Sequence, residues 1–310
     1  MPVSDPFATR YDVPVAGGTL HVARSGRPHA DGLVLAVHGV TASHMAWRAV
    51  ARELTSEQGL CLLAPDLRGR GNSAGLPGPY GLAAHVADLL AVLDDAGAGR
   101  AVLAGHSMGA YVVARLAAEH PDRVAAVVLA DGGVPIPLAA DEDREAVLER
   151  VVGPAIARLQ MTFASREEYV AWWRQHPALA DAWNEDVELY AGYDATGEQG
   201  AIRSVVTEDA VRTDSAELLN VDGARVALDA IRAPAYLLRA PRGFQNEDDK
   251  PFISGDVLAS FVAAYPAVHV ETVADVNHYT LTLGRGPGPS RIAAAIRSAL
   301  RAAQNAREPA

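Results

Sequence analysis

The sequence contains almost no cysteine and almost no lysine. Cys61 is the single cysteine among 310 residues, so no disulfide can form within the chain, and a reducing cytoplasm is the expected compartment. Lys250 is the single lysine, against 26 arginines. A Walker A loop requires a lysine after its glycines, and pyridoxal enzymes require one for the Schiff base. Because Lys250 stands in a polar stretch outside any such pattern, neither class is expected.

Long apolar runs and an excess of positive charge are also lacking. No apolar run approaches the roughly 20 residues that span a bilayer. The net charge of −11 opposes binding to the phosphates of nucleic acid. Residues 1–15 show neither the basic start nor the apolar stretch of a signal peptide. We therefore expect a cytoplasmic protein with no nucleic-acid or membrane partner.

Short apolar segments alternate with amphipathic ones, which is typical of a mostly parallel sheet with helices on both faces. A hairpin is predicted to turn at Gly17-Gly18. The expected strands that follow cover 33–37, 60–64, 101–104, 124–130, 235–240 and 268–273. The expected helices cover 43–56, 81–96, the stretch that follows the strand 101–104 and its turn up to Glu119, 254–264 and 290–303. The predicted fold class is α/β, with a doubly wound, mostly parallel sheet.

This alternation stops in the middle of the chain. From about 134 to 229 the pattern is helical, without clear strands. A helical block inserted after the sixth strand of such a sheet is predicted to form a cap. The predicted division is a core of 1–133 and 230–310, and a cap of 134–229.

The most informative segment is AVLAGHSMG at 101–109, where an apolar strand pattern enters Gly-x-Ser-x-Gly and a helical pattern leaves it. This is the nucleophile-elbow signature, in which a serine occupies a strained strand-to-helix turn. Gly105 and Gly109 have no β-carbon to collide across that turn. The helix start places free backbone N–H groups near the hydroxyl of Ser107, which can stabilise an oxyanion.

Four segments in order resemble the α/β-hydrolase superfamily, in its capped, esterase-like branch. They are His38-Gly39, PDLRGRGNS at 65–73, GHSMG at 105–109 and VNHY at 276–279. The resemblance implies an eight-stranded sheet, Ser107 as nucleophile and His278 as its base. It also implies an oxyanion hole formed by the backbone amides of Met108 and Val40. His269 is expected in a strand. The other histidines outside the motifs are expected at the surface or as capping residues: His21, His29, His44, His85, His120 and His176.

The acid of the triad is left open between two locations. In most of the superfamily it follows the seventh strand, but that position falls near Arg242-Gly243, without a carboxylate. The other location is the end of the sixth strand, where the chain has Asp131. We favour Asp131, because an acid at the end of a strand is better held than one in a long loop. The alternatives lie in the later polar loop: Glu247, Asp248 and Asp249.

These residues predict a serine hydrolase of a carboxylic ester or lactone, with no cofactor and no metal. Dehalogenase and epoxide-hydrolase chemistry need aspartate at the elbow, where this chain has Ser107. Carbon–carbon bond hydrolysis, perhydrolysis and a receptor that binds a small molecule without turnover remain alternatives. The predicted cap carries aromatic residues that either line a substrate pocket or pack the cap onto the core: Trp172, Trp173, Trp183, Tyr190 and Tyr193.

Overall fold

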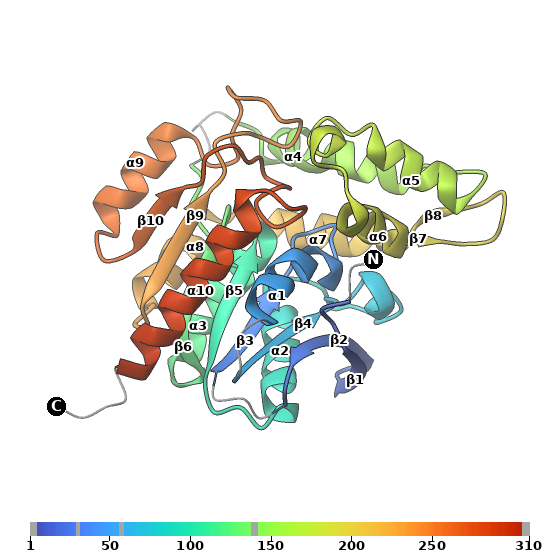
Figure 1. The fold of residues 1–310 in the computed structure, drawn as a ribbon. Coiled ribbons are helices and arrows are strands. Elements are labelled where there is room, and N and C mark those ends of the chain that lie inside the picture. The colour runs from blue at the N-terminus through green and yellow to red at the C-terminus, as the bar shows by residue number, and fades with distance from the viewer. Residues whose placement is uncertain (1–4, 29–31, 56–58, 138–141, 306–310) are drawn as a thin grey trace.

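The computed structural model describes residues 5–28, 32–55, 59–137 and 142–305, and all statements below refer to these (Figure 1). Its main sheet has eight strands in the order β1-β2-β4-β3-β5-β6-β9-β10. Their bounds are β1 Thr9–Val15, β2 Gly18–Gly26, β3 Gly32–Val37, β4 Leu60–Pro65, β5 Ala101–His106, β6 Val124–Ala130, β9 Ala235–Arg239 and β10 His269–Thr272. The β1–β2 and β2–β4 pairings are antiparallel and the rest are parallel. The predicted α/β fold with an eight-stranded sheet is confirmed.

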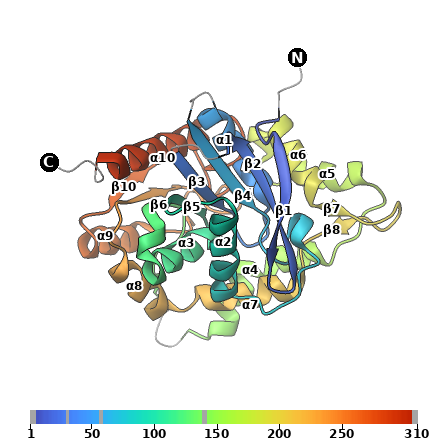
Figure 2. The ribbon, with the colours of Figure 1, turned by 90° about the horizontal axis from the view of Figure 1, so that it is seen from below.

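Helices cover both faces of this sheet (Figure 2). On one face lie α1 (Arg48–Thr55) and α10 (Pro287–Asn305), and on the other α2 (Leu82–Asp95), α3 (Met108–Glu119), α8 (Val221–Ala230) and α9 (Gly255–Ala264). Strand β5 shows why two layers form: Leu103 packs with the α2/α3 cluster, whereas Val102 and Ala104 pack with the α1/α10 cluster. Alternate side chains of a strand point to opposite faces, so an unbroken apolar strand is buried on both sides.

The inserted segment lies over the sheet edge at which the parallel strands end (Figure 1). Its helices are α4 (Arg144–Leu159), α5 (Arg166–Arg174), α6 (Glu185–Asp194) and α7 (Glu208–Leu218), and we call these four helices and the segments that connect them the cap. Between α6 and α7 the chain forms a two-stranded ribbon of β7 (Ala195–Thr196) and β8 (Arg203–Ser204), in a region where no strand was expected. Helix α8 packs on α3 instead, with Ala227 and Leu228 in the main core cluster.

Local differences from the sequence expectation are small. The helix expected from residue 43 begins as a 3-10 turn, η1 (His44–Trp47), capped by the Ser43 side chain, and continues as α1. Further 3-10 turns are η2 (Gly71–Ser73), η3 (Pro121–Arg123) and η4 (Ala180–Ala182). None of the helices in the described ranges is long and apolar enough to cross a membrane.

Candidate active site

The turn between β5 and α3 holds Ser107 in a strained backbone conformation, with φ 55° and ψ −123°. A β-carbon on Gly105 would lie 2.2 Å from the Gly109 carbonyl oxygen, and one on Gly109 would lie 2.1 Å from the carbonyl oxygen of Val37. Both positions therefore require glycine. Strain of this kind persists only where the surrounding structure imposes it. The packing of the turn against β3 and α3 thus presents the Ser107 side chain at the sheet edge.

Asp131 and His278 meet beside this turn. The Nδ1 atom of His278 lies 2.7 Å from Oδ2 of Asp131. Asp131 directly follows β6 and is fully buried, and its Oδ1 accepts the N–H of Ala240 at 3.1 Å. An ionised carboxylate can only accept, so we assign the hydrogen of the imidazole to Nδ1, which leaves the lone pair of Nε2 free.

The loop that carries His278 is tied to the elbow. The Nε2–H of His106 donates to the backbone carbonyl of His278 at 2.8 Å, and the two rings are 4.7 Å apart. His106 immediately precedes Ser107, so this bond connects the loop of His278 to the turn that carries Ser107. Ser107 is 8% exposed, and its hydroxyl has no hydrogen-bond partner in the described residues. Nucleophile–base hydrogen bonds in ligand-free sites are often long and tighten when substrate binds.

The three alternative acids lie elsewhere. Oε2 of Glu247 accepts the N–H of Gln245 at 2.7 Å, within its own loop. Asp248 and Asp249 are exposed. Within the described chain, none of the three is hydrogen-bonded to His278. The structure therefore brings Asp131, and not the loop acids, to the imidazole.

The loop after β3 lies against the elbow. A β-carbon on Gly39 would lie 3.1 Å from Cβ of Ser107. The Nδ1–H of His38 donates to the Gly39 carbonyl at 2.8 Å, and the N–H of Leu67 donates to its Nε2 at 3.0 Å. The Gly39 carbonyl shares a peptide plane with the N–H of Val40, so this bond orients the amide expected in the oxyanion hole. The amides of Val40 and Met108 bond to no backbone carbonyl among the described residues.

A family model for the α/β-hydrolase fold matches residues 32–281. The chain belongs to this family. Lipase LipV of Mycobacterium tuberculosis is 43% identical over 115 residues, which are 37% of this chain and 42% of the lipase. Epoxide hydrolase A of the same organism is 34% identical over 168 residues, 54% of this chain and 47% of that enzyme. The matches thus span a little under half the length of these two relatives.

Solved structures share the fold over nearly the whole chain. The thioesterase domain from the curacin biosynthetic pathway superposes with a TM-score of 0.73 at 19% identity, covering 93% of this chain and 99% of that one. E-2-(acetamidomethylene)succinate hydrolase superposes with a TM-score of 0.71 at 20% identity, covering 94% and 99%. At such identities the likeness establishes the fold of this α/β-hydrolase family member and not its substrate.

Two histidines of this α/β hydrolase depart from the sequence expectation. His44 and His85, expected at the surface or at caps, are fully buried. His85 Nε2 lies 2.9 Å from Oδ2 of Asp214 on α7, and Arg70 reaches the same oxygen at 2.6 Å. Their partners lie far along the sequence, which explains why local pattern did not reveal them. His29 lies outside the described residues.

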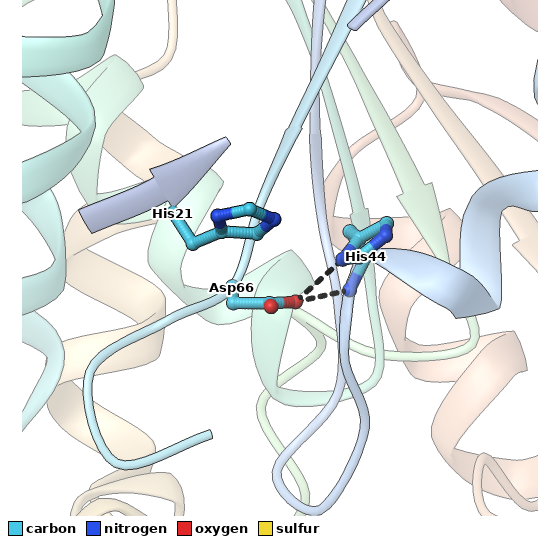
Figure 3. A group of neighbouring side chains, drawn as sticks. All are labelled: His21, His44 and Asp66. Carbon is cyan, nitrogen blue, oxygen red and sulfur yellow. Dashed lines mark hydrogen bonds and ion pairs between the residues drawn. The ribbon is translucent and has the colours of Figure 1, made fainter. Parts of the chain in front are cut away.

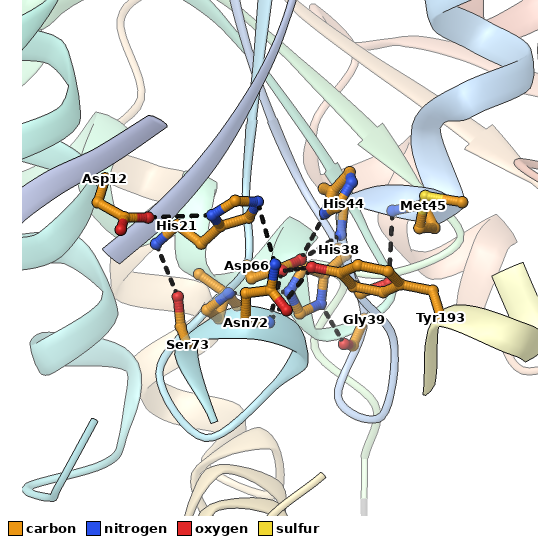
Figure 4. A network of polar contacts seen from close by, with 12 residues as sticks. Asp12, His21, His38, Gly39, His44, Met45, Asp66, Asn72, Ser73 and Tyr193 are labelled. Atoms are coloured by element: carbon orange, nitrogen blue, oxygen red, sulfur yellow. Dashed lines mark hydrogen bonds and ion pairs between the residues drawn. The ribbon is translucent and has the colours of Figure 1, made fainter. Parts of the chain in front are cut away.

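Asp66 forms hydrogen bonds to residues of η1, of η2 and of the cap helix α6 (Figures 3 and 4). Its Oδ1 accepts the backbone N–H and the Nδ1–H of His44, at 2.8 and 2.9 Å. Its Oδ2 accepts the N–H of Asn72 at 2.9 Å and the hydroxyl of Tyr193, on cap helix α6, at 2.6 Å. His21 completes a group with His44 and Asp66 whose nitrogen and oxygen atoms lie within 4.8 Å of one another. Because protein donors fill the acceptor positions of Asp66, this group is a hydrogen-bonded network and not a set of free metal ligands.

Aromatic rings surround His278. Phe244 and Phe252 lie 4.3 and 5.3 Å from its ring, and Tyr279 lies 6.0 Å away. Neither phenylalanine was singled out from the sequence, because both follow β9 in a loop of mixed composition. Among the cap tryptophans, Trp173 is buried and lies 6.3 Å from Tyr279.

The other two cap tryptophans take different positions. Trp172 packs edge-on against Trp173 at 5.4 Å. Trp183 lies under the guanidinium of Arg174 at 5.1 Å and donates to Glu188 at 3.4 Å. Thus Trp173 is the member of the predicted set whose ring lies next to Tyr279, and a substrate role for all three stays a prediction.

The buried histidines make the stability of the fold depend on pH. Burial lowers the pKa of His38 from 6.5 to about 4, and it lowers the pKa of His106 well below 6.5. Both side chains are therefore neutral in the fold, and protonation favours the unfolded chain below pH 6.5. For His38 we expect the unfolding free energy to fall by about 2 kcal/mol between pH 7 and pH 5, and His106 should lower it further in the same direction.

Urea unfolding at the two pH values measures this loss. In His38→Gln the decrease should be smaller, because one of the two titrating groups is gone. His269→Gln is the control, since His269 is exposed on β10 and its removal should leave the decrease as it is. An identical decrease in wild type and His38→Gln would contradict the assignment to His38.

Proposed function

We propose that this protein is a serine hydrolase that cleaves a carboxylic ester or lactone of a small molecule. In this proposal Ser107 is the nucleophile, His278 its general base and Asp131 the residue that orients the imidazole. The observation that carries the proposal is the 2.7 Å contact between His278 and Asp131, at the side of a strained elbow serine. Nucleophile, base and orienting acid in this arrangement are the parts that acyl transfer requires.

The chemistry follows from the positions of these groups. Oγ of Ser107 forms a bond to the substrate carbonyl carbon while its proton passes to Nε2 of His278. The carbonyl oxygen gains the negative charge, which the N–H groups of Val40 and Met108 stabilise. Collapse of this intermediate expels the alcohol, which takes the proton from His278. Water then attacks the acyl-enzyme by the same route, and the carboxylic acid leaves.

Two relatives bear on the reaction type. Lipase LipV, by its name, acts on lipid esters, which favours ester cleavage here. Epoxide hydrolase A matches a longer stretch, but epoxide opening in this superfamily uses an elbow aspartate, where this chain has Ser107. The elbow residue therefore favours acyl transfer over epoxide opening.

Labelling with a fluorophosphonate, followed by a panel of esters and lactones, tests the proposal. A hydrolase of this kind should be labelled at Ser107 and should release acid from at least one class in the panel. Tight binding of panel compounds with neither labelling nor turnover would instead indicate a small-molecule receptor.

His278→Ala is expected to prevent labelling of Ser107, because a serine hydroxyl is a weak nucleophile without a positioned base. The measurement is the rate of fluorophosphonate incorporation. The matched control is His269→Ala, which removes an exposed imidazole outside the site. Labelling of His278→Ala at the wild-type rate would remove His278 from the role of base.

A further inference from the structure

Asn277 directly precedes the base His278 and is 3% exposed. Its side-chain Oδ1 accepts the backbone N–H groups of Tyr279 and Thr280, at 3.0 and 2.9 Å. The first of these bonds closes an Asx-turn, a hydrogen-bonded ring that includes the backbone of His278. The backbone N–H of Asn277 in turn donates to Oγ1 of Thr280 at 2.8 Å. The acceptor half of the Asn277 amide therefore restricts the backbone dihedral angles of the residue that carries the imidazole.

The donor half of the same amide forms bonds outside this turn. Nδ2 of Asn277 donates to the carbonyl oxygen of Ala178 at 2.9 Å and to Oδ1 of Asn246 at 3.0 Å. Ala178 belongs to the cap, in the segment between α5 and η4, and Asn246 follows β9. The two donor hydrogens and the two acceptor positions of the amide are thus all occupied. A fully satisfied buried polar group makes its surroundings rigid, and this one joins the loop of His278 to the cap.

The core holds the backbone of His278 through separate bonds. The N–H of His278 donates to the Arg242 carbonyl at 3.2 Å, and its carbonyl oxygen accepts from His106 at 2.8 Å. These bonds should keep the loop folded when the Asn277 side chain is changed. Neither of them involves the cap, whereas the Nδ2 bond to Ala178 does. A displacement of this cap segment would therefore move the turn around His278 through the Asn277 side chain.

We propose that Asn277 is a positioning residue, which holds the imidazole of His278 in line with Ser107 and Asp131 by joining its turn to the cap. The proposal rests on the hydrolase function above, in which His278 is the general base. Rotation of the imidazole lengthens the path of the proton from Ser107, and a misplacement of about 1 Å can lower a rate by about 10²-fold. Because Asn277 acts through His278 and not on the substrate, its loss should lower kcat and leave KM nearly unchanged.

Two substitutions separate the halves of the amide. Asn277→Ser removes both Nδ2 bonds but keeps a side-chain oxygen that can close the turn around His278, since serine forms such turns more weakly. Asn277→Ala removes both halves. We expect kcat to fall about tenfold in Asn277→Ser and about 100-fold in Asn277→Ala, with KM within about threefold of wild type. A wild-type kcat in Asn277→Ser would show that the Nδ2 bonds do not position the base, and would overturn the proposal.

Asn184, on the cap, provides matched controls. Its Oδ1 accepts the N–H groups of Asp186 and Val187 at 2.9 and 3.3 Å, and its Nδ2 donates to the Ala182 carbonyl at 3.1 Å. It therefore makes the same kinds of bond away from His278, and Asn184→Ser and Asn184→Ala should keep the wild-type kcat. Thermal melting verifies that all four variants are folded. An equal loss of kcat in the Asn184 variants would show a general effect of loosening the cap, against the proposal.

Fluorophosphonate labelling of Ser107 distinguishes positioning from a merely structural role. The final extent of labelling counts the folded sites, whereas its rate depends on the alignment of the base. Asn277→Ser should reach the wild-type extent at a rate about tenfold lower. A reduced extent at the wild-type rate would mean that the substitution only destabilises the fold, and would overturn the proposal.

The proton on Nδ1 of His278 separates this inference from the proposed function, because its signal needs no turnover. A proton held between an imidazole and a carboxylate gives an NMR signal downfield of the amide region, and its absence in His278→Ala assigns it. The signal should persist in Asn184→Ser and weaken in Asn277→Ser, where the imidazole is less firmly held. This difference in a protein that turns over no ester supports the positioning role and defeats the hydrolase function. Ester turnover with signal and kcat unchanged in Asn277→Ser defeats the inference and leaves the hydrolase function standing.

Discussion

Ser107→Ala is expected to lower kcat by about 10⁴-fold to 10⁶-fold, with fluorophosphonate labelling lost. The oxygen that forms the acyl bond is removed, and no other serine occupies a strand-to-helix turn of this kind among the described residues. The thermal midpoint should stay close to that of wild type, because the Ser107 hydroxyl has no hydrogen-bond partner to lose.

The control for this variant is Ser290→Ala, which removes an exposed hydroxyl on α10. Its activity and labelling should equal those of wild type. If Ser107→Ala keeps activity within about tenfold of wild type, the elbow serine is not the nucleophile. Substrate binding in Ser107→Ala should persist, since the cap and the aromatic residues around His278 are unchanged.

The sheet and the elbow could be predicted because their signals are local. Strands such as Val124–Ala130 are continuous apolar runs, and the elbow needs two glycines at fixed spacing from Ser107. Burial on both faces requires apolar residues along the whole strand, and the lack of room for a β-carbon requires glycine, so both constraints can be recognised in the sequence. Element type and order were therefore readable without tertiary information.

Contacts between distant segments left no such trace. His44 stands among polar and small residues, a pattern typical of the surface, but it is fully buried and hydrogen-bonded to Asp66, which follows 22 residues later. The carboxylate that holds Arg70 lies on a cap helix, at Asp214. Helix α8 has the periodicity of its cap neighbours, and only its packing on α3 places it with the core. In each case a contact between residues far apart in the sequence decides where the residue or helix lies, and the local sequence pattern contains no information about that contact.

The choice between Asp131 and the loop carboxylates as the acid of the triad also depended on a contact between distant segments, the one with His278. The sequence offered one carboxylate at a strand end and three in a loop, and rigidity favoured the strand end. The folded chain places Asp131 at a positive φ of 44°, which turns its side chain out of the strand and toward His278. A conformation of that type is uncommon outside glycine, asparagine and aspartate, and it is consistent with an orienting role.

Asp131→Asn is the variant that tests this role most directly, and we expect it to lower kcat by about 10²-fold to 10⁴-fold. Asparagine tolerates the backbone conformation at this position, so the fold should be retained. The measurement is kcat on the best ester of the panel, together with the rate of fluorophosphonate labelling. Asp248→Asn and Asp249→Asn are matched controls that remove exposed charges, and each should stay within about fivefold of wild type.

The hydrogen bonds around Asp131 explain why so small a change should cost so much. Oδ1 accepts the N–H of Ala240, so an asparagine keeps its carbonyl oxygen there and turns its NH₂ group toward His278. The reverse orientation would place that NH₂ against the Ala240 N–H, donor against donor. With a donor facing Nδ1, the imidazole must carry its hydrogen on Nε2, where it cannot accept the proton of Ser107. Activity of Asp131→Asn close to that of wild type, or an equal loss in Asp248→Asn, would show that another group sets the tautomer of His278.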